Sequence, residues 1–325
     1  MPKQLIIGDI HGCYAEFQEL LDRAALTADD EIIALGDIVD RGPDTPRVLK
    51  FFREHTTARA IQGNHERKHW RWFYGEIKSA LSQRITRLQL GEEEYPAAVA
   101  FMQSFPLYLD LPEAILAHGY WEPGRGPAQQ RETVLAGTMS GEAYLRKNYA
   151  AVWYELYDGD KPLIVGHHDY QRNRQPLIYR DKVFALDTGC CTGGALTGLI
   201  LPYFRVVSVP SRANYWRQTK APFRVLVVAP PPPPKWNDEE EADLSRLQNI
   251  VLQEHERALV HLRQNSAYDS LTPHGQGKAY AACVGDAPLA YFLHLARRGE
   301  LNTERLRRYF KTPIRVKRLL GRLGV

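Results

Sequence analysis

The sequence predicts an α/β fold with one largely parallel sheet, a second sheet and a small helical C-terminal extension. Three observations support this prediction. Short apolar strands alternate with helix-like stretches in the first hundred or so residues, closely spaced strand-like runs follow to about residue 210, and a proline run then precedes a helical tail. Alternating strands and helices are typical of βαβ crossovers, which join parallel strands.

The first part of the chain contains three strand-like runs, each followed by a stretch with helical apolar spacing. The runs "QLIIGD", "EIIALGD" and "ARAIQGN" are short, apolar and rich in branched residues, as buried strands are. The expected strands are 4–9, 31–37 and 58–64, and the expected helices are 14–26, 45–55 and a long region from 69 to 102.

The middle of the chain contains further strand-like runs joined by short turns. They are "LYLDLPEAILAHG" (107–119), "KPLIVGHH" (161–168), "PLIYRDKVFALDTG" (176–189) and "ALTGLILPYFRVVSV" (195–209). Short connections favour strand pairing over crossovers. We therefore expect these runs to form a second sheet that packs on the first.

A proline run divides the chain near residue 230. Pro230 to Pro234 cannot continue a sheet or a helix, and such a run is a stiff spacer. The expected parts are a catalytic domain at 1–229, a linker at 230–235 and a helical region at 236–325. The helical region opens with an acidic first turn after Asn237 and ends with an excess of arginine and lysine.

The composition is that of a soluble globular protein, with 44% hydrophobic and 25% charged residues. No apolar run is long enough to span a bilayer, so we expect no membrane partner. The four cysteines form neither a zinc knuckle nor a disulfide framework, and no signal-peptide pattern precedes the first strand. These features favour the cytoplasm. A net charge of +4 does not by itself indicate a polyanionic partner.

Polar side chains that can bind metals follow five of the expected strands. Because ligands bind beyond the carboxyl ends of strands in an open α/β sheet, these side chains should lie together. A set of oxygen and imidazole ligands without cysteine suits manganese, iron or zinc in a two-metal site. The residues are Asp9, His11, Asp37, Asp40, Asn64, His65, His118, His167 and His168, and Arg41, a cation that can bind phosphate, follows Asp40 at the same edge.

The stretch "GNHERKH" also fits a different enzyme. His65, Glu66 and His69 match the H-E-x-x-H pattern, in which a helix places two zinc ligands one turn apart. That pattern requires a helix that begins before His65. The preceding "IQGN" favours a loop, so we disfavour the zinc-protease interpretation and expect His69 to be an ordinary helix residue.

The ordered motifs "GDIHG", "GDIVDRGP", "GNHE", "AHG" and "GHH" resemble those of the calcineurin-like metallophosphoesterase superfamily. More narrowly they resemble the phosphoprotein-phosphatase branch, which includes serine/threonine phosphatases, symmetrical diadenosine tetraphosphatases and polynucleotide-end phosphatases. The similarity extends over about residues 4 to 210, including "LDTGCCTGGALTGLILP". It implies a four-layer α/β/β/α sandwich and a metal-dependent phosphoric ester hydrolase.

The resemblance also implies a role for each motif residue. Two divalent ions, most simply Mn²⁺ with iron and zinc as alternatives, would hold a hydroxide that attacks phosphorus. His65 would protonate the leaving oxygen with Asp40 orienting it, while Arg41 and Asn64 would contact the substrate phosphate. The implied metal ligands are Asp9, His11, Asp37, Asn64, His118 and His167.

One departure concerns the end of the motif series. The wider superfamily often has a second histidine two residues after the first, but here "GHHDY" places Tyr170 near that position and leaves His168 without a role. The phosphoprotein-phosphatase branch also lacks that ligand. A second phosphate-binding arginine has no clear match, and Arg172 and Arg174 are candidates by proximity only.

The expected function is hydrolysis of a phosphomonoester, and two alternatives stay open. One is hydrolysis of a dinucleoside polyphosphate such as diadenosine tetraphosphate, for which the aromatic run Trp70 to Tyr74 would stack a base. The other is a nucleic-acid end phosphatase whose basic C-terminal region binds RNA or a protein partner. In that region a solvated helix face or an intramolecular lid is an equally good interpretation.

Overall fold

We describe the protein from a computed structural model, in which residues 2–223, 236–265, 267–285 and 289–325 are described. The expected linker at 230–235 lies outside these residues. Contacts divide the chain into two compact units, one of residues 1–73 and 77–231 and one of residues 74–76 and 232–325. None of the helices among the described residues is long and apolar enough to cross a membrane.

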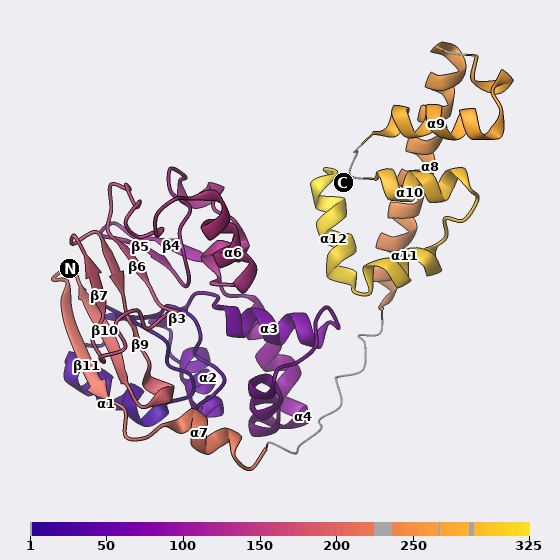
Figure 1. The fold of residues 1–325 in the computed structure, drawn as a ribbon. Helices are drawn as coiled ribbons and strands as arrows, with labels where there is room; N and C mark the ends of the chain where they lie inside the picture. The colour runs from indigo at the N-terminus through magenta and orange to yellow at the C-terminus, as the bar shows by residue number, and fades with distance from the viewer. Residues whose placement is uncertain (1, 224–235, 266, 286–288) are drawn as a thin grey trace. The chain divides into compact units, whose positions relative to one another are not determined.

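The first unit contains two sheets (Figure 1). Three strands of the larger sheet are parallel: β1 (Gln4–Ile7), β2 (Glu31–Ala34) and β3 (Ala58–Ala60). On the side of β1 away from β2, β10 (Ala195–Leu201) pairs antiparallel with β1. β11 (Arg205–Pro210) and the short β9 (Asp187–Thr188) each pair antiparallel with β10. The order is therefore β11-β10-β1-β2-β3.

The smaller sheet has the order β4-β5-β6-β8-β7. Its inner strands run parallel from β5 to β6 to β8, and β4 and β7 pair antiparallel at the edges. The bounds are β4 (Tyr108–Asp110), β5 (Ile115–Ala117), β6 (Leu163–Val165), β7 (Leu177–Tyr179) and β8 (Val183–Ala185).

One strand prediction was wrong in its placement. The run 195–209 was expected in the second sheet, but it forms β10 and β11 of the first. All seven residues of β10 are buried, and the strand pairs with β1 along the edge that the parallel strands leave open. Strand spacing along the chain carries no information about which sheet receives a strand, so the sequence pattern could not make this choice.

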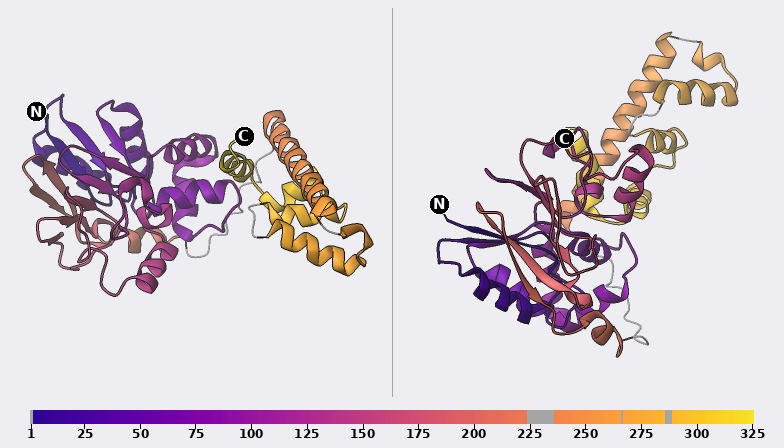
Figure 2. Two further views of the ribbon diagram at one scale, coloured as in Figure 1. Left: turned by 90° about the horizontal axis from the view of Figure 1, so that it is seen from above. Right: turned by 60° about the vertical axis from the view of Figure 1, so that its left-hand side comes forward.

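The two sheets and their helices form four layers, as expected. Apolar side chains such as Ile33, Leu116 and Phe184 pack between the sheets. On the outer face of the larger sheet, α1 (Tyr14–Ala24) packs on β10 and β11, and α2 (Thr45–Glu54) packs on β3. On the outer face of the smaller sheet, residues of α5 (Glu132–Leu135) and α6 (Met139–Asn148) join the apolar cluster. Figure 2 shows the helices and strands of the first unit from two further directions.

The helices begin and end where the sequence supplies the necessary groups. Asp44 caps α2 by accepting a hydrogen bond from the backbone N–H of Arg47, and Pro46 occupies the first turn, where its missing N–H costs nothing. The long region expected at 69–102 is instead α3 (Asn64–Phe73) and α4 (Leu81–Gln103). α4 is kinked at Gly91, whose φ is +77°.

The remaining short elements of the first unit are η1 (Pro127–Gln129), η2 (Cys190–Thr192) and α7 (Tyr215–Lys220). The asparagine side chain of Asn214 caps α7 by accepting from the backbone N–H of Arg217. Glu16 of α1 binds the segment at the start of α7. Its carboxylate accepts hydrogen bonds from the Tyr215 hydroxyl at 2.8 Å and from the Arg212 backbone N–H at 2.9 Å.

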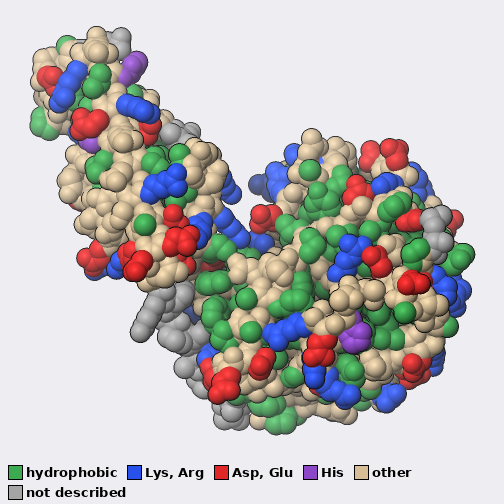
Figure 3. Space-filling model, turned by 180° about the vertical axis from the view of Figure 1, so that it is seen from behind, with side chains coloured by type: hydrophobic (Ala, Val, Ile, Leu, Met, Phe, Trp, Pro, Cys, Tyr) green, Lys and Arg blue, Asp and Glu red, His purple; other side chains and the backbone are tan. Residues whose placement is uncertain are grey.

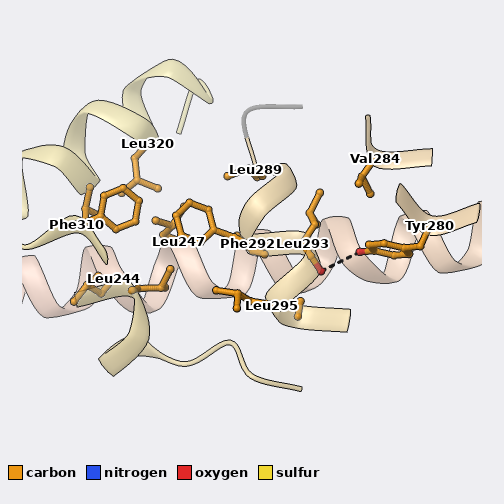
Figure 4. Close-up of a cluster of buried hydrophobic side chains, with 14 of the residues drawn as sticks. Leu244, Leu247, Tyr280, Val284, Leu289, Phe292, Leu293, Leu295, Phe310 and Leu320 are labelled. Carbon is orange, nitrogen blue, oxygen red and sulfur yellow. Dashed lines mark hydrogen bonds between the residues drawn. The ribbon is translucent and has the colours of Figure 1, made fainter. Parts of the chain in front are cut away.

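The second unit is helical, as the sequence predicted. Its long α8 (Asp238–Asn265) carries the apolar residues Leu244, Leu247 and Val251 into a core that all the later helices share. Phe292 and Phe310 stack in this core (Figure 4). The other elements are η3 (Tyr268–Ser270), α9 (Pro273–Val284), α10 (Ala290–Arg297), α11 (Thr303–Phe310) and α12 (Pro313–Arg322).

Many basic residues of the second unit form ion pairs within it. Arg307 donates to Glu241 at 2.6 Å, and Lys317 lies 3.0 Å from Glu239, so the acidic start of α8 neutralises charges of α11 and α12. Figure 3 shows blue and red side chains interspersed over the face of this unit that it presents. The C-terminal excess of positive charge is therefore partly compensated by folding.

Candidate metal centre

The strand ends of both sheets bring the motif residues together. Strands β1, β2 and β3 are parallel to one another, as are β5 and β6, so the carboxyl ends of each set lie at one edge. Asp9 and His11 follow β1; Asp37, Asp40 and Arg41 follow β2; Asn64 and His65 follow β3; His118 follows β5; and His167 follows β6.

Asp37 is the centre of the cluster. Its Oδ1 lies 3.4 Å from His118 Nε2, and its Oδ2 lies 3.7 Å from His11 Nε2 and 3.9 Å from His65 Nε2. The Oδ1 atom also accepts the backbone N–H of His65 at 2.9 Å. The ligand atoms fall into two groups around this carboxylate, one with His11 and His65 and one with His118 and His167. A shared carboxylate between two ligand groups is what a bridged pair of cations requires.

Two imidazoles are fixed so that Nε2 faces the cluster. His11 Nδ1 donates to the Val39 carbonyl at 2.7 Å, and His118 Nδ1 donates to the Leu35 carbonyl at 2.7 Å. Such a hydrogen bond sets the tautomer and leaves the other nitrogen as an acceptor. Burial lowers the pKa of both histidines below their ordinary value. Neutral imidazoles of this kind are the form that binds metals.

His167 and Asp9 complete the site from the two sheets. The Asp9 carboxylate accepts the backbone N–H of His167 at 2.8 Å, which ties the end of β1 to the end of β6. Burial, with His118 nearby, lowers the pKa of His167 to about 3. Burial and the neighbouring carboxylates of Asp187 and Asp37 raise the pKa of Asp9 well above its ordinary value. A cation bound here would relieve that repulsion.

Asn64 places a carboxamide beside Asp37 and the group formed by His118 and His167. With its nitrogen turned toward the cluster it donates to Asp37 Oδ2 at 3.0 Å, and that atom lies 3.1 Å from His118 Nε2. The opposite amide rotamer turns a carbonyl oxygen, which is a metal-ligating atom, to the same position. The residues present, with buried carboxylates, neutral imidazoles and an amide, therefore fit divalent cations.

Arg41 occupies part of the site in this structure. Its guanidinium donates to His11 Nε2 at 3.0 Å, and this nitrogen is the atom that His11 would offer to a metal. A cation on His11 therefore requires the guanidinium to turn away.

Arg41 and Asp37 lie on a loop where several non-glycine residues adopt left-handed backbone conformations. Such conformations cost about 1–3 kcal/mol each and are concentrated at functional sites. The site residues with positive φ are His11, Asp37, Asp40, Arg41 and His167.

Asp40 is a fully buried carboxylate with four hydrogen-bonding side chains around it. His65 Nδ1 lies 2.5 Å from Oδ2, and His69 Nε2 lies 2.8 Å from Oδ1. Gln83 and Thr86 of α4 donate to the same two oxygens. Although burial opposes it, the contacts with His69 and His65 hold the pKa of Asp40 well below its ordinary value. The carboxylate is thus kept ionised to orient His65.

His69 lies on a helix, as expected, but it is not an ordinary helix residue, because it is buried and contacts Asp40. Residues 64–73 form α3, so His65 and His69 do lie one turn apart on a helix, contrary to the loop expected there. The two histidines nevertheless direct His65 Nδ1 and His69 Nε2 to Asp40, and their other nitrogens face Asp37 and Tyr95, so the rings do not point at one common position. This arrangement disfavours the zinc-protease interpretation on a different ground. His69 is fully buried, and its Nδ1 contacts the Tyr95 hydroxyl at 3.0 Å. It is a positioning residue behind His65.

Glu66 is a further positioning residue that the motif analysis left without a role. Its carboxylate accepts the backbone N–H groups of Asp37, Ile38 and Gly63, each at 2.9 Å. These bonds join the loop after β2 to the loop after β3 and hold Asp37 in its left-handed conformation. The motif "GNHE" displays the glutamate, but its full burial, and therefore its need for backbone donors, is visible only in the structure.

Other candidates lie outside the cluster. His168 is exposed, and its ring packs edge-on to Tyr170 with centroids 4.7 Å apart. Arg172 and Arg174 are exposed on the following turn. Trp70 and Trp72 are buried in α3, so neither presents a face on which a base could stack.

Comparisons with known proteins agree with this geometry. The family model described as calcineurin-like phosphoesterase matches residues 2–168. A protein of Halalkalibacterium halodurans named bis(5′-nucleosyl)-tetraphosphatase PrpE [asymmetrical] is 35% identical over 64% of this chain and 93% of its own length. Its namesake in Bacillus subtilis is 30% identical over 65% of this chain and 95% of its own. A crystal structure provisionally assigned as a diadenosine tetraphosphatase superposes with a TM-score of 0.54 at 23% identity, covering 65% of this chain and 96% of that one.

Proposed function

The chain belongs to the calcineurin-like phosphoesterase family, and we therefore propose that this hydrolase cleaves the phosphate chain of a dinucleoside tetraphosphate with the help of two divalent metal ions. The observation that carries the substrate is the similarity to proteins named bis(5′-nucleosyl)-tetraphosphatases over 93% and 95% of their lengths. The buried cluster around Asp37 supports the reaction, because it gathers anionic and neutral ligands where a phosphate could be held only with cations.

The ions would be held by the side chains that face Asp37. We assign Asp9 and His11 to one ion, Asn64, His118 and His167 to the other, and Asp37 to both. When bound, divalent ions lower the pKa of a water molecule and neutralise charge on the phosphoryl oxygens. Oxygen and imidazole ligands without cysteine favour Mn²⁺, with Fe and Zn as alternatives.

His65 is proposed as the proton donor to the leaving phosphate oxygen. Its Nδ1 is held by Asp40, which fixes the orientation of the ring and leaves Nε2 to act. His65 Nε2 is buried beside Asp37 and has no hydrogen-bond partner among the described residues. A buried nitrogen without a partner is costly unless a ligand completes it. The substrate oxygen is the partner that this assignment supplies.

Arg41 is proposed to bind the substrate phosphate together with Asn64. In the structure its guanidinium lies on His11 Nε2, where it provides positive charge next to Asp37 and Asp9. With cations bound by these carboxylates, the guanidinium is free to turn to phosphate oxygens, for which its planar donors are well suited. Arg41 thereby supports charge that develops on the phosphoryl group.

The test is product analysis on diadenosine tetraphosphate with Mn²⁺. Asymmetrical cleavage yields AMP and ATP, whereas symmetrical cleavage yields two molecules of ADP, and chromatography separates these outcomes. We expect AMP and ATP, no turnover after removal of divalent ions by EDTA, and recovery when Mn²⁺ is restored. Turnover that survives complete metal removal would falsify the two-metal assignment, and an absence of nucleotide products would remove the substrate assignment.

A phosphomonoester is the second candidate. It is favoured by the composition of the cluster, in which every assigned residue acts on the phosphoryl group or on the leaving oxygen and none selects the leaving group. The same assay with p-nitrophenyl phosphate, a phosphoserine peptide and a 3′-phosphorylated oligonucleotide distinguishes it. A kcat/KM that is higher for one of these than for diadenosine tetraphosphate would reverse the order of the two candidates.

A nucleic-acid or protein partner for residues 236–325 stays a prediction. The ion pairs of Arg307 and Lys317 with the start of α8 reduce the charge available to a polyanion. Retention on immobilised RNA by the full chain, lost when the salt concentration is raised, would support a nucleic-acid partner. Equal elution of the full chain and of a control protein of the same net charge would dismiss it.

A further inference from the structure

An aromatic pocket lies next to the metal centre in the first unit. Its volume is about 720 Å³, within the range of small-molecule sites. Tyr120 and Trp153 are buried at 6% exposure each and form its deep part, while the half-buried rings of Tyr149 and Tyr170 line it further out. None of these residues has a place in the proposed chemistry.

Direct contacts connect this pocket to a proposed metal ligand. The Tyr120 hydroxyl lies 3.1 Å from His167 Nε2, and the two rings meet edge-on with centroids 5.1 Å apart. Tyr120 also packs edge-on against Trp153, and Trp153 Nε1 donates to the Tyr170 hydroxyl at 3.1 Å. A molecule in the pocket therefore lies beside the residue that closes one end of the metal cluster.

Polar residues line the pocket toward solvent. Glu142 and Arg146 lie one turn apart on α6, with the buried Leu145 on the same face of that helix. Glu155 and His168 line other parts of the pocket, and all four polar residues are exposed. An apolar aromatic floor with a few polar groups around it is the usual composition of a site for a small organic ligand. This arrangement also gives His168 a location at the edge of a pocket.

We propose that this pocket binds a nucleoside of the nucleotide substrate, so that the attached phosphate chain reaches the metal centre. The inference rests on the proposed function and names the part of the chain that selects a nucleotide. Aromatic side chains can stack with any of the nucleic-acid bases. The rings of this pocket are held by hydrogen bonds and edge-on contacts, so binding a base requires little further ordering of these side chains. The pocket provides the base contact once expected of Trp70 to Tyr74.

The charges around the pocket favour particular bases. Ionised carboxylates only accept hydrogen bonds, so Glu142 and Glu155 suit a base that carries an exocyclic amino group. Adenine has such a group, whereas uracil does not. We therefore expect a lower KM for diadenosine tetraphosphate than for diuridine tetraphosphate, with the difference reduced in Glu142→Ala.

The deciding experiment uses the full chain with Mn²⁺ and a Tyr170→Leu variant. Two constants are measured: the KM for diadenosine tetraphosphate, and the inhibition constant of inorganic tripolyphosphate, which has a phosphate chain and no base. Loss of one stacking ring should raise the KM about tenfold to a hundredfold and leave the inhibition constant unchanged. Tyr170→Phe keeps the ring and should retain most of the affinity. Tyr203→Leu is the control, because Tyr203 is an exposed tyrosine between β10 and β11.

The outcomes separate this inference from the function on which it rests. An unchanged KM in Tyr170→Leu, or an equal weakening for both compounds, would overturn the nucleoside pocket while leaving the hydrolysis in place. If the wild-type chain hydrolyses no dinucleotide, equilibrium dialysis of AMP against wild type and Tyr170→Leu decides the question. Binding to the wild type that the variant loses supports the pocket without the proposed reaction. An absence of AMP binding to the wild type overturns it.

Discussion

The two units of this chain bury very different side chains. In the first, the region where the strands end holds four carboxylates and several imidazoles at low exposure, on loops with left-handed backbone. In the second, the core is mostly apolar, and one of its buried hydroxyls, that of Tyr280, is partnered by His255 and by the Leu293 carbonyl. Charged residues of the second unit lie outside that core and pair across helices.

This difference separates residues that serve chemistry from residues that serve folding. Burying ionisable groups costs free energy unless partners or ligands compensate, so a cluster such as that around Asp37 is a candidate ligand-binding site. An apolar core needs no such explanation, because burial of its side chains itself stabilises the unit. The predictions below test whether the two kinds of region respond differently to substitution.

The largest effect is expected for Asp37→Asn. The substitution removes the negative charge that four imidazoles and two ligand groups share, so metal affinity and transition-state stabilisation are lost together. We expect kcat/KM to fall by about 10⁴-fold, corresponding to about 5.4 kcal/mol. Elemental analysis of the purified protein should show less than two bound ions. Asp29→Asn, at an exposed carboxylate, is the matched control, and full metal occupancy in Asp37→Asn would contradict the bridging role.

A core substitution in the second unit should change stability and not chemistry. Leu247 is fully buried in α8, and Leu247→Ala should lower the free energy of unfolding of that unit by about 2–5 kcal/mol because it leaves a cavity. Denaturant titration followed by circular dichroism measures this change, with the exposed Leu252→Ala as control. The initial rate of hydrolysis under native conditions should be unchanged. A parallel loss of rate would show that the second unit takes part in the reaction.

A smaller effect is expected behind the proposed proton donor. His69→Leu removes one of the hydrogen bonds that hold Asp40, and loss of such an outer partner costs about 10–100-fold. The decrease should appear in kcat and leave the KM unchanged, since His69 contacts no substrate in the proposed site. His69→Gln, whose amide can donate to Asp40, should restore part of the rate. A KM that rises with no change in kcat would speak against a positioning role.

The smallest effect concerns pH and the second unit. Burial lowers the pKa of His255, which pairs with Tyr280 and lies near Glu256 and Arg297. The unfolded chain therefore binds a proton at His255 more readily than the folded chain does. As a result the free energy of unfolding does not suffer from this group above the unfolded pKa of about 6.5, and it declines as the pH falls below that value. Denaturant titrations at pH 7.5 and 5.5 should show this decline, reduced in His255→Gln. His294, whose ring also packs on Tyr280, is present in both proteins, so the comparison isolates the contribution of His255. An identical decline in the variant would assign the pH dependence to other groups.

Much of the first unit could be predicted from the sequence, because the patterns that indicate its strands and strand ends lie within short stretches of the chain. Apolar runs followed by Asp, Asn and His predicted β1, β2, β3, β5 and β6 and the edge where their ends meet. The helical C-terminal region followed from apolar periodicity in α8 and from an acidic first turn. These signals depend on residues near one another in the chain, which a single sequence displays.

The tertiary structure decided the partnerships between distant residues. It placed β10 and β11 in the first sheet, directed His69 to Asp40, joined two loops through Glu66, and set Tyr120 against His167 beside an aromatic pocket. Each of these contacts links segments tens of residues apart, and a side chain's type does not reveal which distant group it meets. The sequence by itself therefore determined the candidate ligand residues and the strands that carry them. Packing determined what surrounds those residues, because burial and hydrogen bonding are properties of neighbours in space.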